Sequence, residues 1–121
     1  MAKIVVIDDS RMMRTVLRRI LERGGHEVVE WEPMSAMEVL EKVGEEKPDL
    51  LITDYQMPGA NGATVVKMAR KAIPGIKIIA FTALRDEEVV ELLGRVEVNA
   101  VLTKPAHEES LLDAVTTILA K

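Results

Sequence analysis

Short apolar runs alternate with longer amphipathic stretches along the whole chain. The apolar runs predict five strands, at Lys3–Ile7, Glu27–Trp31, Leu50–Thr53, Lys77–Phe81 and Ala100–Thr103. Four of these runs are dominated by apolar residues, which is typical of strands that helices cover on both faces of a parallel sheet. The run Glu27–Trp31 mixes glutamates with valines and therefore indicates a strand at the edge of the sheet.

The amphipathic stretches predict five helices, over about 10–23, 35–45, 62–72, 86–96 and 107–120. Ser10 is expected to cap the first helix, and the glycines at 24 and 25 to end it. In the second helix, Met37, Leu40 and Val43 are predicted to share the buried face, because they recur at helical spacing.

Regular alternation of strands and helices predicts a single α/β domain over residues 1–121, with a five-stranded parallel sheet and helices on both faces. Right-handed crossovers leave few topologies for such a chain. Because the second strand resembles an edge, the doubly wound, flavodoxin-like order 2-1-3-4-5 is favoured.

Composition narrows the function classes. The 121 residues carry 20 acidic and 16 basic side chains, a net charge of −4, with one Trp, one Tyr and one Phe. Without a basic stripe or aromatic platforms, direct nucleic-acid binding is not expected. The chain has no cysteine, which excludes disulfides and thiolate metal sites, and its first apolar run is too short for a membrane span. We expect a cytoplasmic protein without membrane contact.

Polar residues directly follow four of the predicted strands. Asp8-Asp9 ends the first strand, Asp54 the third, Thr82 the fourth and Lys104 the fifth. In a parallel sheet these positions share one edge, and ligands bind there at the point where strand order reverses. Three carboxylates brought together repel one another and need a hard cation, and oxygen-only ligands favour Mg²⁺.

An acidic, metal-binding edge with one lysine and one hydroxyl suits a phosphoryl group. The metal and Lys104 would neutralise its oxygens, and Thr82 would donate a hydrogen bond to one of them. An aspartate can itself be the nucleophile and form an acyl phosphate. Asp54 is the best candidate, because it stands alone after a central strand while Asp9 is available for the metal.

Five short segments carry a family resemblance. The chain resembles receiver domains of two-component response regulators over its whole length, through segments that contain or follow a predicted strand. They are Asp8-Asp9-Ser10, Lys47-Pro48-Asp49-Leu50-Leu51-Ile52-Thr53-Asp54, Tyr55-Gln56-Met57-Pro58, Thr82-Ala83 and Lys104-Pro105.

The resemblance implies a phosphorylation site and a metal site. Asp54 would accept phosphate from the phosphohistidine of a sensor kinase or phosphotransfer protein. Asp9, Asp54 and the backbone carbonyl of Gln56 would ligate Mg²⁺, with Mn²⁺ as a substitute, and Asp8 would act through water. The protein would then be a regulator whose only chemistry is to accept and lose its own phosphate, rather than an enzyme.

The resemblance also implies a switch. Lys104 would pair with the phosphoryl group, Thr82 would move to contact it, and the Lys104–Pro105 bond would be cis. The face made by the last two helices and the last strand would change its affinity for a downstream protein, either in a monomer or in a phosphorylation-linked dimer. The family usually carries an aromatic residue where this chain has Val101, so we expect coupling through loop and backbone shifts instead.

Other functions remain open from the sequence. Asp8-Asp9-Ser10 alone also fits a simple helix cap with favourable acids. The chain could be a pseudo-receiver, a docking module that is never phosphorylated, and Val101 keeps this hypothesis open. A small-molecule phosphatase on the same fold usually has Asp-x-Asp at the nucleophile, whereas this chain reads Asp54-Tyr55-Gln56. A flavin carrier fits the fold, but the first strand runs into acids rather than into a phosphate-binding loop.

Overall fold

Five parallel strands form the central sheet of the computed structural model, which describes residues 2–32, 35–57, 60–82, 91, 98–104 and 107–120. The strands are β1 (Lys3–Ile7), β2 (Glu27–Trp31), β3 (Leu50–Asp54), β6 (Lys77–Thr82) and β7 (Ala100–Thr103). Their order is β2-β1-β3-β6-β7, and every neighbouring pair is parallel. The predicted fold class and strand order are therefore confirmed.

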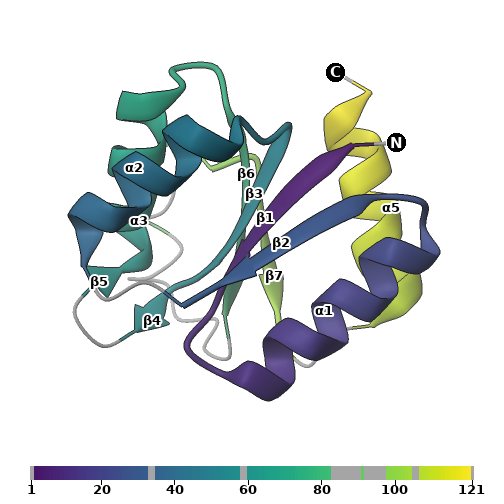
Figure 1. The fold of residues 1–121 in the computed structure, drawn as a ribbon. Coiled ribbons are helices and arrows are strands. Elements are labelled where there is room, and N and C mark those ends of the chain that lie inside the picture. The colour runs from purple at the N-terminus through teal and green to yellow at the C-terminus, as the bar shows by residue number, and fades with distance from the viewer. Residues whose placement is uncertain are drawn as a thin grey trace.

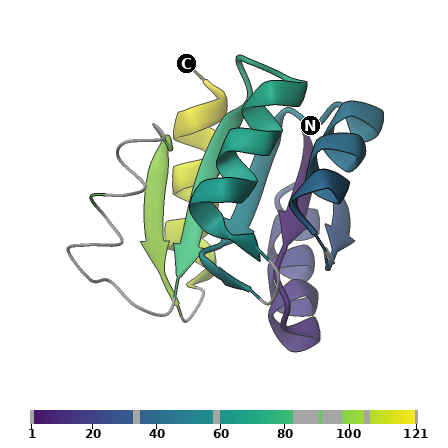
Figure 2. The same cartoon turned by 90° about the vertical axis from the view of Figure 1, so that its left-hand side faces the viewer.

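Helices cover both faces of this sheet (Figures 1 and 2). Within the described residues they are α1 (Arg11–Arg23), α2 (Ala36–Glu46), α3 (Gly62–Ala72) and α5 (Glu108–Leu119). Helices α1 and α5 lie on one face, and α2 and α3 lie on the other. The helix predicted over 86–96 falls outside the described residues, except for Glu91.

Alternate residues of the central strands build two cores. In β1, Ile4 and Val6 pack on the side of α1 and α5, whereas Val5 and Ile7 pack on the side of α2 and α3. All four side chains are buried. Because successive residues of a strand point to opposite faces, an uninterrupted apolar run is what a doubly covered strand requires.

Local signals place the helix ends where the pattern predicted them. The Ser10 hydroxyl accepts a hydrogen bond from the Met13 N–H at the start of α1. Gly24 ends that helix, and Gly25 follows with a φ of 88° that glycine adopts without strain. At the start of α2, Ser35 and Glu38 exchange hydrogen bonds in a capping box.

Three features differ from the sequence-based expectations. Met37 was predicted to be buried but is 59% exposed, and the buried residues of α2 are Val39 and Val43. Strand β7 is only partly buried, because it pairs on one side alone, with β6. An antiparallel pair, β4 (Gln56–Met57) with β5 (Ala60–Asn61), was not predicted and directly precedes α3.

Candidate functional site: an acidic edge with one lysine

The carboxyl edge of the sheet gathers the predicted site residues. Asp8, Asp54 and Thr82 stand at the ends of β1, β3 and β6, and all three are buried. Asp9 is exposed, and Lys104 directly follows β7. The parallel register produces this convergence, because Ile7 is level with Thr53 and Thr82 is level with Thr103.

Three carboxylates meet at the reversal of strand order between β1 and β3. One carboxylate oxygen from each of Asp8, Asp9 and Asp54 lies within 4.8 Å of the others. The Lys104 ammonium lies 2.9 Å from Asp8 Oδ2 and 3.4 Å from Asp54 Oδ2. One ammonium thus faces three acids, so this cluster carries excess negative charge.

Burial and the neighbouring charges together change the pKa values of Asp54 and Lys104. Burial, and then the neighbouring charge of Asp8, raise the pKa of Asp54, and Lys104 opposes this shift only in part. Burial disfavours the Lys104 ammonium, but its hydrogen bonds and charge interactions with Asp8 and Asp54 outweigh burial and raise its pKa. The environment therefore stabilises the charged form of Lys104 and destabilises the ionised form of Asp54.

The backbone around Asp54 is tightly braced. The Tyr55 N–H donates to Asp54 Oδ1 over 2.8 Å, and the Thr53 hydroxyl donates to the Asp54 carbonyl over 2.9 Å. The first residue of α3, Gly62, donates its N–H to the Tyr55 carbonyl over 2.6 Å. A Cβ at Gly62 would lie 2.8 Å from Tyr55 Cα and 3.1 Å from the Asp54 carbonyl oxygen, so this contact requires glycine.

Asp8 is held by groups that sequence reasoning missed. The Ser10 N–H donates to Asp8 Oδ1 over 2.8 Å, and Arg14 Nη1 donates to the Asp8 carbonyl over 2.7 Å. The Asp8 N–H reaches the Trp31 carbonyl of β2 over 3.3 Å. Arg14 was overlooked because it belongs to a helix rather than to a strand end. Its position one turn after the cap Ser10 is the signal that could have identified it.

The expected switch position on β7 holds an aliphatic side chain. Val101 is partly buried, lies level with Ala80 and packs with Tyr55 around it. Phe81 lies on the opposite face in the core, and Lys104 Nζ is 6.0 Å from the centre of its ring. The arrangement therefore has an aliphatic residue on β7 where the family pattern has an aromatic one. The Lys104–Pro105 bond lies outside the described residues, as does the side chain of Gln56.

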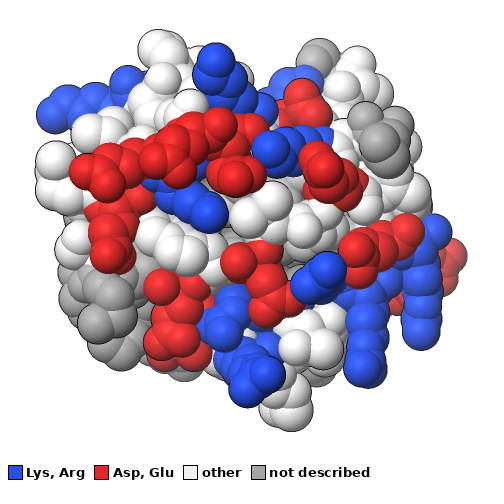
Figure 3. Space-filling model, in the orientation of Figure 1, with Lys and Arg blue, Asp and Glu red and all other residues white. Residues whose placement is uncertain are grey.

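Surface charge agrees with the composition. Figure 3 shows acidic and basic side chains intermixed on the face that it presents, with acidic side chains gathered over α2. On the described part of this face, no continuous basic stripe is seen. None of the described helices is long and apolar enough to cross a bilayer.

Comparisons with known proteins agree with this geometry. The chain is 33% identical to protein PilH of Pseudomonas aeruginosa, over 99% of each chain, and 28% identical to chemotaxis protein CheY of Thermotoga maritima, over 96% of each. A CheY-like response regulator receiver domain structure from Methanospirillum hungatei superposes with a TM-score of 0.88, at 27% identity, covering 98% of this chain and 93% of that one. The response regulator receiver domain profile matches residues 4–116. The chain therefore belongs to the family of response regulator receiver domains.

Proposed function

We propose that the protein is a phospho-acceptor receiver, in which Mg²⁺-dependent phosphorylation of Asp54 switches binding to a protein partner. The observation that carries this proposal is the meeting of three carboxylates within 4.8 Å, with Lys104 Nζ 3.4 Å from Asp54 Oδ2. A site that only stabilised the fold would not be expected to bury like charges side by side.

The donor set fits a hard divalent cation. Asp8, Asp9 and Asp54 offer only oxygen ligands, and the chain has no cysteine to favour a softer metal. Asp9, Asp54 and the backbone carbonyl of Gln56 would hold Mg²⁺ directly, and Asp8 would hold it through water. When bound, the cation supplies positive charge that offsets the acids and the oxygens of an incoming phosphoryl group.

The chemical step transfers a phosphoryl group between two side chains. A carboxylate oxygen of Asp54 attacks the phosphorus of a phosphohistidine, forming a P–O bond as the P–N bond breaks. The departing imidazole keeps the electron pair of that bond and takes up a proton. Lys104 stabilises the charge on the transferred group, and Thr82 donates a hydrogen bond to it. Tyr55 N–H, which already holds Asp54 Oδ1, leaves Oδ2 on the lysine side as the attacking atom.

The expected partners follow from this chemistry. A sensor histidine kinase or phosphotransfer protein supplies the phosphoryl group, and a downstream protein reads the face that includes β7 and α5. We place the protein in the cytoplasm, and propose that residues 1–121 form one receiver domain that does not itself bind nucleic acid. Because β7 carries Val101, we propose that loop and backbone shifts, rather than an aromatic rotamer, transmit the signal.

Mass spectrometry tests the proposal. The protein is incubated with acetyl phosphate and Mg²⁺, and its intact mass is followed with and without EDTA. We expect the mass of one added phosphoryl group in the presence of Mg²⁺, none after Asp54→Asn, and normal labelling after Asp49→Asn, a matched change at the far edge of the sheet. If no donor or histidine kinase labels the parent protein, the chain is a docking module instead.

A further inference from the structure

Arg14 ties the acidic edge to the outer strand of the sheet. It lies on α1, and its side chain is 11% exposed, so it is the least exposed of the cations in the ion pairs of the described residues. Nη1 donates to the Asp8 carbonyl over 2.7 Å. That carbonyl belongs to the peptide group that joins Asp8 to Asp9, the two neighbouring acids of the site.

Two glutamates also pair with the guanidinium. Arg14 Nε lies 3.5 Å from Glu30 Oε1, and Nη1 lies 3.5 Å from Glu32 Oε2. Glu30 belongs to β2 and is level with Val6 of β1, and Glu32 directly follows β2. We call Arg14, Glu30 and Glu32 the Arg14 clamp. The clamp spans from α1, across the end of β1, to the end of β2.

The clamp acts on a rigid unit. A peptide group is planar, so fixing its oxygen also fixes the direction in which the chain enters Asp9. Asp8 itself is held at four atoms. Trp31, Ser10 and Lys104 contact its N–H, Oδ1 and Oδ2, and Arg14 contacts its carbonyl oxygen. Asp9 is exposed, so its placement depends on this peptide group more than on packing.

We propose that Arg14 is a positioning residue for the divalent cation, and that it orients the Asp8–Asp9 turn through its hydrogen bond to the Asp8 carbonyl. This inference rests on the proposed function, since it concerns the same metal site. Arg14 does not need to touch the cation, because partners of ligating groups commonly set metal affinity through orientation alone.

Electrostatics alone predicts that removing Arg14 changes the Mg²⁺ affinity in the opposite direction. Arg14 is a cation close to the acids, so its removal makes the site more negative and should strengthen binding of Mg²⁺. Loss of positioning should weaken binding. The direction of the change therefore separates a positioning role from a mere charge effect, and also from a role limited to stability.

Calorimetric titration of the unphosphorylated protein with Mg²⁺ provides the test, without any phosphoryl donor. Arg14→Met is expected to weaken Mg²⁺ binding by about 10-fold. Arg14→Lys keeps the charge but loses the planar fork, and is expected to weaken binding by about 3-fold. Arg18→Met is the matched control. Arg18 also pairs with Glu30, one turn further along α1, but its other partner is Glu22. Its affinity should stay within about 2-fold of the parent.

Each outcome decides one of the two proposals. If the parent protein binds no Mg²⁺, the proposed function fails. If the parent binds and Arg14→Met binds equally well or more tightly, the positioning role is overturned. Should Arg14→Met fail to fold, as circular dichroism would reveal, Arg14→Lys decides, since its charge is unchanged and unaltered affinity would refute the role. Mg²⁺-induced shifts of the Asp8 and Asp9 amide signals, smaller in the Arg14 variants than in Arg18→Met, give an independent readout.

Discussion

The two edges of the same sheet use charged side chains in opposite ways. At the carboxyl edge, Asp8, Asp9 and Asp54 crowd together, and Asp8 and Asp54 share Lys104. At the amino edge, Asp49 and His26 each bind a separate backbone group. Asp49 Oδ2 accepts from the Lys3 N–H over 2.8 Å, and His26 Nδ1 accepts from the Ala2 N–H over 3.2 Å.

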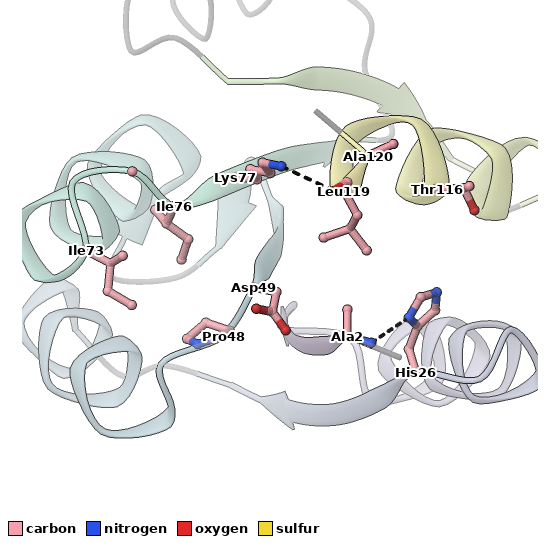
Figure 4. A pocket seen from close by; sticks show the side chains of 11 residues that line it. Ala2, His26, Pro48, Asp49, Ile73, Ile76, Lys77, Thr116, Leu119 and Ala120 are labelled. Atoms are coloured by element: carbon pink, nitrogen blue, oxygen red, sulfur yellow. Dashed lines mark hydrogen bonds between the residues drawn. The ribbon is translucent and has the colours of Figure 1, made fainter.

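The amino edge also borders a cavity of about 690 Å³, which His26, Asp49 and Lys77 line from separate segments of the chain (Figure 4). Lys77 Nζ lies 3.5 Å from the Leu119 carbonyl, so this lysine also binds a backbone group, at the last residue of α5. Polar side chains at the amino edge stabilise the fold, because they bind backbone groups of other segments. Those at the other edge oppose one another, which is expected where function has taken precedence over local stability. Changes that remove charge should therefore have different consequences at the two edges.

Removing the shared lysine should have the largest effect on stability. Lys104→Met leaves two buried carboxylates without their cation, and is expected to lower the free energy of unfolding by about 3 kcal/mol. Lys77→Met, at the amino edge, should cost less than about 1 kcal/mol. Urea denaturation without Mg²⁺ measures both. Adding Asp54→Asn to Lys104→Met should recover part of the loss, and no recovery would mean that the two residues are not coupled.

Adding a methyl group at a glycine of each edge tests the difference in packing, rather than in charge. Gly62→Ala forces Cβ against the Tyr55 backbone, so we expect a loss of about 2 kcal/mol in the free energy of unfolding and slower phosphorylation of Asp54. Gly75→Ala, beside the amino-edge cavity, meets nothing within 4 Å and should change stability by less than about 0.5 kcal/mol. Denaturation and labelling with acetyl phosphate test both variants, and equal effects would show that the loop after Asp54 tolerates displacement.

Sequence pattern predicted the strands and the acidic edge because both depend on local order. A buried parallel strand needs a run such as Leu50–Thr53, and Asp54, which follows that run, must lie at the common edge. The pattern failed for Met37, because successive steps of three residues drift by about 60° around a helix and leave the buried stripe. Arg14 and Gly62 were missed because their roles come from contacts between elements, which no local pattern contains.

Removing the charge of one aspartate at each edge should change the free energy of unfolding in opposite directions. Asp54→Asn relieves its repulsion with Asp8, and should raise the free energy of unfolding of the metal-free protein by about 1 kcal/mol. Asp49→Asn weakens the bond to the Lys3 N–H, and should lower it by about 0.5 kcal/mol. Thermal denaturation in EDTA measures the pair. A loss of stability in both variants would show that Lys104 already compensates the acids fully.

The smallest effect concerns pH at the amino edge. Burial lowers the pKa of His26, whose neutral Nδ1 accepts the Ala2 N–H. A histidine with a folded-state pKa below its unfolded value stabilises the fold fully above about pH 6.5, and this contribution is lost as pH falls through the folded-state pKa. His26→Gln should therefore flatten the decline in melting temperature below pH 6.5, whereas His107→Gln, an exposed residue, should not. A parallel decline in both variants and the parent would assign acid sensitivity to the carboxylates instead.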